Sequence, residues 1–133
     1  MARTTVVDDY PQFLELMQSV LTALEGHQVS GLDSADTTLD DLIHSQPDVV
    51  ITDLRVAQDQ VREWATLVMA RTSDELRHVP IIICSADIEA LRGRAEEFRQ
   101  LGNIFTLEKP FAIDDLLAVL GEVVAQSSAA ARA

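Results

Sequence analysis

The sequence predicts a doubly wound α/β domain of three layers, in which helices cover both faces of a parallel sheet. Short uncharged runs of β-branched residues recur along the chain, as expected for strands that are buried on both faces. Stretches with apolar residues three and four positions apart follow these runs and predict amphipathic helices. Five such strand and helix pairs, joined by right-handed crossovers, form a (βα)5 domain.

Size and composition favour one folded domain. The chain has 133 residues, of which 47% are hydrophobic, and a net charge of −12. This length suffices for one hydrophobic core, and the apolar content argues against a disordered acidic chain. We assign residues 1–126 to the domain and expect residues 127–133, which are small and lack periodicity, to form a flexible tail.

The charge and the single cysteine exclude several classes of function. Nucleic-acid binding needs a basic stripe, whereas nine arginines and one lysine are scattered among twenty-two acidic residues. No apolar run approaches the length of about eighteen residues that a membrane-spanning helix needs. No signal peptide precedes the first predicted strand, and one cysteine, Cys84, excludes a disulfide framework. We therefore expect a cytoplasmic protein.

The predicted strands cover residues 4–7, 29–32, 49–52, 81–84 and 104–107, and Gly31 interrupts the second of them. In the flavodoxin-like strand order 2-1-3-4-5, the first and third strands are neighbours at the switch point, where such sheets bind ligands. The first helix is expected to begin near Pro11 and to end before Gly26, because apolar residues keep helical spacing between them.

Four further helices are expected, and their apolar stripes define them. The residues that form these stripes are Leu39, Leu42 and Ile43; Val61, Trp64, Ala65, Val68 and Met69; Leu91, Ala95, Phe98 and Leu101; and Leu116, Leu117, Leu120 and Val123. The fourth helix, over residues 88–101, contains Gly93, which costs about 1 kcal/mol relative to alanine. We expect this helix to be marginal.

Polar residues follow four of the predicted strands directly. Asp8 and Asp9 follow the first strand, Asp53 the third, Ser85 the fourth, and Lys109 comes soon after the fifth. Because the carboxyl ends of parallel strands meet at one edge, these residues are expected to lie together. Three carboxylates need a compensating cation, and oxygen ligands suit Mg²⁺. A lysine and a hydroxyl beside them suit a phosphoryl group, with Asp53 as the nucleophile.

Each of these residues also has an ordinary structural interpretation. The first two aspartates could cap a helix, Asp53 could be a surface acid, Ser85 could cap the next helix, and Lys109 could simply be solvated. The functional interpretation is favoured because each residue falls at the carboxyl end of a different predicted strand.

Four segments carry a resemblance to a known family. VVDDYP, PDVVITD, IIICSA and LEKPF resemble the signature segments of the response regulator receiver domain of two-component signalling, over about residues 3–125. The resemblance implies that a histidine kinase phosphorylates Asp53 and that the domain is not a turnover enzyme. It also implies that Asp9, Asp53 and the backbone carbonyl of Arg55 bind Mg²⁺ directly and Asp8 through water, while Ser85 and Lys109 bind the phosphoryl oxygens.

The resemblance also implies partners: a sensor histidine kinase or a phosphotransfer protein of a phosphorelay, a downstream protein target, and a possible homodimer through the fourth helix, fifth strand and fifth helix. Two features depart from the family. Residues 56–61 read VAQDQV instead of a proline followed by an aspartate-glycine turn. Thr106 occupies the position of an aromatic residue that usually swings inward on activation, and Phe105 is expected on the opposite strand face.

Two other functions remain open. A receiver-like interaction module that never uses phosphorylation is favoured if the departures after Val56 spoil metal binding. An aspartate-based phosphatase usually has a second acid two residues after the nucleophile to protonate the leaving group, and that position holds Arg55.

Overall fold

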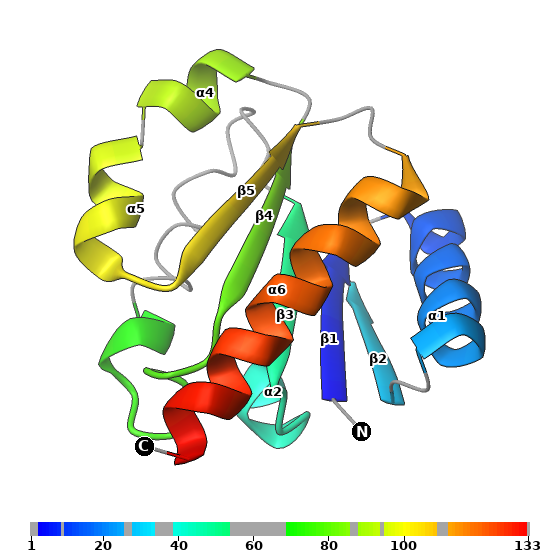
Figure 1. Ribbon diagram of the computed structural model, residues 1–133, viewed down its shortest axis with the longest axis horizontal. Coiled ribbons are helices and arrows are strands. Elements are labelled where there is room, and N and C mark those ends of the chain that lie inside the picture. The colour runs from blue at the N-terminus through cyan, green and yellow to red at the C-terminus, as the bar shows by residue number, and fades with distance from the viewer. Residues whose placement is uncertain are drawn as a thin grey trace.

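Five parallel strands form one sheet in the predicted order, β2-β1-β3-β4-β5 (Figure 1). The computed structural model describes residues 3–8, 10–25, 28–33, 39–53, 69–85, 88–93, 95–108 and 112–132. The strands are β1 (Arg3–Asp8), β2 (Gln28–Asp33), β3 (Val49–Asp53), β4 (Ile81–Ser85) and β5 (Ile104–Glu108). The doubly wound α/β fold and its strand order are therefore confirmed.

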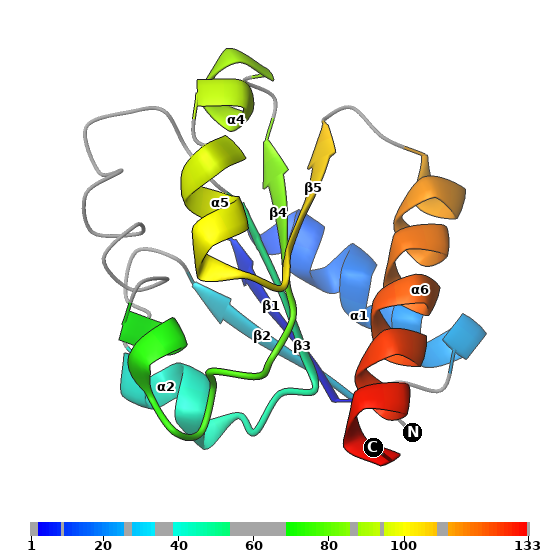
Figure 2. The ribbon, with the colours of Figure 1, turned by 60° about the vertical axis from the view of Figure 1, so that its left-hand side comes forward.

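Helices cover both faces of this sheet. They are α1 (Pro11–Glu25), α2 (Leu39–His44), α4 (Ile88–Gly93), α5 (Ala95–Leu101) and α6 (Ile113–Arg132). Figure 2 shows α1 and α6 on one side of the sheet and α2 and α5 on the other. Within the described part of the chain, no helix is both long enough and apolar enough to cross a membrane.

Two apolar clusters, one on each face of the sheet, form the core. Successive strand residues point to opposite faces, so Val6 belongs to the cluster under α1 and α6 while Val7 belongs to the cluster under α2 and α5. The first cluster also contains Met17, Leu21, Ile51, Ile82, Leu116 and Leu120, and the second contains Leu42, Val50, Leu76, Ile83 and Phe98. Burial on both faces explains why the central strands read as unbroken apolar runs.

The second strand is continuous, so the predicted interruption at Gly31 is wrong. This glycine pairs with Val6 of β1. A β-carbon at Gly31 would lie 3.6 Å from Cβ of Leu14 in α1. A β-carbon there would make an ordinary van der Waals contact with Leu14, and the glycine does not end the strand.

Two helix predictions need correction. The helix expected over residues 88–101 is divided into α4 and α5 after Gly93. The last helix continues to Arg132 and so includes residues 127–132 of the expected flexible tail, whose flexibility stays a prediction. Most of the third predicted helix lies outside the described residues, but residues 69–72 are helical. Met69 was placed on the apolar face of that helix, yet it is 51% exposed, and Ala70 beside it is buried.

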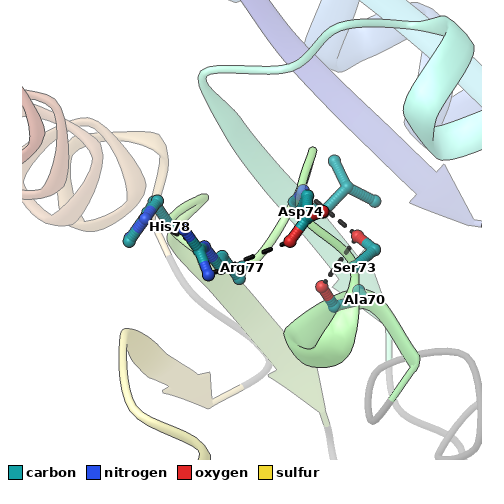
Figure 3. Close-up of polar contacts among 6 residues, drawn as sticks. Ala70, Ser73, Asp74, Arg77 and His78 are labelled. Carbon is teal, nitrogen blue, oxygen red and sulfur yellow. Dashed lines mark hydrogen bonds and ion pairs between the residues drawn. The ribbon is translucent and has the colours of Figure 1, made fainter.

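A hydrogen-bonded turn joins residues 69–72 to β4 (Figure 3). The Ser73 hydroxyl donates to the Ala70 carbonyl oxygen at 3.1 Å and accepts from the Leu76 amide at 3.1 Å. On its outer side, Arg77 forms an exposed ion pair with Asp74 and donates from Nε to Nε2 of His78 at 3.2 Å. The turn is thus defined by its own polar groups, and it leads Leu76 into the core.

Candidate functional site

The register of the sheet brings Asp8 and Asp53 to neighbouring strand ends. Val7 of β1 pairs with Thr52 of β3, and Asp8 and Asp53 are the next residue of each strand. Neighbouring strands lie about 4.8 Å apart. The two backbones therefore place two aspartates side by side at the carboxyl edge, as the sequence predicts.

Ser85 extends this row to β4. Asp53 pairs with Cys84, so Ser85 is one residue farther along the neighbouring strand. With a strand spacing of about 4.8 Å and a rise of about 3.3 Å, the Cα atoms of Asp53 and Ser85 are about 6 Å apart. Ser85 in turn pairs with Glu108 of β5, the residue before Lys109. Three of the predicted residues are thus on adjacent strands at one edge.

The Asp8 carboxylate is buried, with 3% of the residue exposed. Its Oδ1 atom accepts a hydrogen bond of 2.9 Å from the Tyr10 amide, immediately before α1 begins at Pro11. This bond supports the structural interpretation, in which the aspartate orders the start of the helix. It involves one of the two carboxylate oxygens, so the same side chain can also serve a cation. Burial of a carboxylate is costly unless charge and hydrogen bonds compensate it.

Ser85 is also buried, with 2% of the residue exposed. Its hydroxyl stands at the last position of β4, and α4 begins three residues later at Ile88. A hydroxyl is one donor with two acceptor lone pairs, which suits an oxyanion. Its place at the end of a fully buried strand fixes it relative to the backbone of Asp53.

The remaining predicted residues, Asp9, Arg55 and Lys109, lie outside the described residues, as does the side chain of Asp53. Their roles stay predictions. Over the part of the chain that is described, no three His, Cys, Asp or Glu side chains form a group that could hold a metal ion. The donor chemistry that can be examined does fit Mg²⁺, because Asp8 supplies a buried carboxylate oxygen beside the strand end of Asp53.

Strand β5 presents different residues to its two sides. Phe105 packs against the cluster that contains Leu116 of α6, which confirms its expected orientation, whereas Thr106 is exposed. Thr106 lines a shallow pocket between α5 and β5, which is lined by Arg92, Ala95, Phe98, Arg99, Ile104, Thr106 and Glu108. The threonine therefore lies at a hollow in the surface formed by α4, α5 and β5.

Arg71 is a polar residue whose importance the sequence did not reveal. Its guanidinium donates to five backbone carbonyl oxygens, among them Val79 at 2.7 Å and Gly102 at 3.0 Å. Burial lowers the pKa of this guanidinium. Arginine is common in the last turn of exposed helices. The partners of Arg71 are backbone carbonyl oxygens, which every residue has, so the sequence shows no pattern that identifies it.

Comparison with known proteins agrees with this architecture. The family model for the response regulator receiver domain matches residues 4–121. No curated protein matches the sequence significantly. Among solved structures, the chemotaxis protein CheY4 of Vibrio cholerae has a TM-score of 0.78 at 21% sequence identity, covering 92% of this chain and 98% of that one.

Two further structures are similar. A response regulator from Desulfuromonas acetoxidans has a TM-score of 0.77 at 19% identity, with 95% of this chain and 98% of that chain covered. The receiver domain of the sensor histidine kinase PA1611 from Pseudomonas aeruginosa, with magnesium coordinated in its active site cleft, has a TM-score of 0.68 at 24% identity, with 93% and 98% covered. The structures show a shared fold, and the family match over most of the sequence shows membership: the chain belongs to the response regulator receiver domain family.

Proposed function

We propose that this receiver domain accepts a phosphoryl group on Asp53 and signals by a phosphorylation-dependent change of its protein-binding surface. The observation that supports this is the row of strand ends in which Asp8, Asp53 and Ser85 stand on three adjacent strands. Aspartyl phosphorylation needs a nucleophilic carboxylate, a second carboxylate that binds a cation and a hydroxyl that binds an oxyanion.

In the proposed reaction, a carboxylate oxygen of Asp53 attacks the phosphorus of a phosphohistidine. The new O–P bond forms as the P–N bond breaks, and the histidine nitrogen leaves with the electron pair. The Ser85 hydroxyl donates a hydrogen bond to a phosphoryl oxygen, and the Lys109 ammonium offsets its negative charge. Water later hydrolyses the acyl phosphate and restores the carboxylate.

The proposed ligands of Mg²⁺ are Asp8, Asp9, Asp53 and the backbone carbonyl of Arg55. The ion would offset negative charge on the transferring phosphoryl group. Asp8 contributes a carboxylate that the fold already buries at the strand end. Its hydrogen bond with the Tyr10 amide fixes its orientation before any ion binds.

A sensor histidine kinase or a phosphotransfer protein is the proposed donor, and a downstream protein is the proposed target. The domain acts in the cytoplasm as a signalling module and does not turn over an external substrate. The surface of α4, α5, β5 and α6 is where we expect partner binding or homodimerisation, because exposed Thr106 and its pocket lie there.

Intact mass spectrometry tests the phosphorylation. Incubation with acetyl phosphate and Mg²⁺ should add one phosphoryl group to the wild-type chain and none to Asp53→Ala. Asp40→Ala is a matched control, because Asp40 is an exposed aspartate in α2, and it should be phosphorylated like the wild type. An adduct that persists in Asp53→Ala would remove this residue from its role.

A phosphorylation-independent interaction module is the second candidate, and the exposed Thr106 in the place of an aromatic residue favours it. Beryllofluoride with Mg²⁺ mimics an aspartyl phosphate and separates the two functions. A rise in melting temperature supports the phosphoacceptor, whereas no thermal or spectral response supports the module.

A further inference from the structure

The segment between β4 and β5 consists of two short helices where helical spacing predicts one. The helix α4 ends at Gly93 and α5 begins at Ala95. A β-carbon at Gly93 would meet no atom within 4 Å. No neighbouring group therefore requires a glycine there, and glycine disfavours the helical backbone.

The second of these helices is tied to the core. Phe98 is 5% exposed and lies in the same cluster as Leu76 and Ile83. At the end of α5, the Gly102 amide donates to the Phe98 carbonyl oxygen at 3.0 Å. Gly102 has φ of +76° and Asn103 has φ of +54°, so two successive left-handed residues end the helix and turn the chain into β5.

The guanidinium of Arg71 fixes this turn. Nε donates to the Gly102 carbonyl oxygen and Nη2 to that of Asn103, both at 3.0 Å. Nη1 approaches the carbonyl oxygens of Leu76 at 3.2 Å, Arg77 at 3.4 Å and Val79 at 2.7 Å. We call these five acceptors the carbonyl cage. Only arginine presents a planar fork of donors that can serve two chain segments at once.

The carbonyl cage joins segments that are about thirty residues apart in sequence. Arg71 lies in the helical residues 69–72, residues 76–79 precede β4, and residues 102 and 103 precede β5. The Ile81 amide adds a backbone bond of 2.9 Å to the Asn103 carbonyl oxygen. The start of β4, the start of β5 and the end of α5 are thus held together at the edge opposite the candidate site.

The first helix of the pair, α4, is exposed at Glu89, Arg92 and Gly93, the positions whose exposure the structure describes. Its principal contacts are with α5, whereas α5 contacts β5. Figure 1 shows α4 beyond the carboxyl end of the sheet, with α5 alongside β5. Since α4 begins three residues after Ser85, a shift at the end of β4 reaches α4 first.

We propose that Arg71 is a positioning residue that holds α5 and the start of β5 as one unit, so that α4 moves about Gly93 while α5 stays in place. The proposal goes beyond phosphoryl acceptance, because it concerns the unphosphorylated domain. The carbonyl cage defines the fixed part of the α4, α5 and β5 surface, and Gly93 defines where the movable part begins.

Amide hydrogen exchange on the unphosphorylated full chain tests this without any phosphoryl donor. In the wild type, the amides of Leu101 and Gly102 should exchange about tenfold or more slowly than those of Arg92 and Gly93, because local opening of α4 leaves α5 intact. Equal protection of the two helices would overturn the proposal.

Two substitutions of Arg71 separate its role from general stability. In Arg71→Ala and in the milder Arg71→Lys, protection at Leu101 and Gly102 should fall toward that of α4, measured relative to the core amide of Ile83. Arg77→Ala is the matched control, because Arg77 is an exposed arginine of the same turn, and it should leave α5 protected. If α5 loses no more protection than Ile83 in either Arg71 variant, the proposal is wrong.

Gly93→Ala tests the hinge. Alanine has room at this position, and its higher helix propensity should raise protection at Arg92 about fivefold by joining α4 to α5. Unchanged protection at Arg92 would show that α4 does not open at Gly93. Neither outcome depends on Asp53, so failure here leaves the proposed phosphorylation standing.

Discussion

Replacing Arg71 with alanine should destabilise the domain substantially, although this residue lies far from the candidate site. The substitution removes all five bonds of the carbonyl cage. Three of them, to Leu76, Val79 and Gly102, are partly buried, and two are exposed. Water replaces the exposed bonds at little cost, so the partly buried bonds dominate.

The magnitude follows from those three bonds. A net contribution of about 1 to 1.5 kcal/mol for each gives a loss of about 3 to 4.5 kcal/mol. The desolvation that lowers the pKa of Arg71 opposes folding, and its removal in the variant reduces the loss to about 3 kcal/mol. For a domain of this size, that corresponds to a fall in melting temperature of about 10 °C.

Urea unfolding followed by circular dichroism measures this loss, with Arg77→Ala as the control. The surface arginine should change the free energy of unfolding by less than about 0.5 kcal/mol. Guanidinium chloride at low concentration should stabilise Arg71→Ala more than potassium chloride does, because the ion can occupy the vacated carbonyl cage. A loss below about 1 kcal/mol for Arg71→Ala would refute the reasoning, because the partly buried carbonyls would then not need the guanidinium.

Three further substitutions test the fold. Ser45 donates its proton to the Leu42 carbonyl oxygen, so the Thr5 hydroxyl donates to Ser45 at 2.8 Å. Thr5→Val should therefore cost about 1 kcal/mol in thermal unfolding, and an unchanged melting temperature would contradict this. Gly102→Ala should cost about 1 to 2 kcal/mol in urea unfolding, because φ is +76°; a stabilised variant would argue against that turn. Leu116→Ala should cost about 3 to 4 kcal/mol, because the leucine is 0% exposed; a loss below about 1 kcal/mol would remove α6 from the core.

The sheet could be predicted from the sequence because its strands are buried on both faces. Such strands need uncharged, β-branched runs, and residues 49–52 and 81–84 show them clearly. Right-handed crossovers then predicted a doubly wound domain, and the strand order was that of flavodoxin-like sheets. Even Phe105 was placed on the correct face, because alternation along a strand is a fixed property of the backbone.

The errors concern features that local spacing does not determine. Gly31 appeared to interrupt β2, but the strand continues through its pairing with Val6 of β1. Met69 kept helical spacing with its neighbours, yet tertiary packing buries Ala70 instead. The cost of Gly93 was anticipated, whereas the hydrogen bonds from Arg71 to the carbonyl oxygens that follow α5 were not. Long-range bonds to backbone carbonyls leave no trace in the sequence.

For the candidate site, the sequence predicted the edge and the structure describes part of it. Asp8 and Ser85 are buried at the ends of β1 and β4, and the backbone of Asp53 in β3 lies between them. Strand ends are predictable, because the fold fixes them. The other predicted site residues, Asp9, Arg55 and Lys109, are in the segments that follow the strands. They lie outside the described residues.

The most direct test of the central claim is to identify the phosphorylated residue. After treatment with acetyl phosphate and Mg²⁺, borohydride reduction converts an aspartyl phosphate to homoserine, and tandem mass spectrometry of peptides locates it. We predict homoserine at position 53 alone. Homoserine at Asp8 or Asp9, or no conversion anywhere in the chain, would contradict the assignment of Asp53 as the phosphoacceptor.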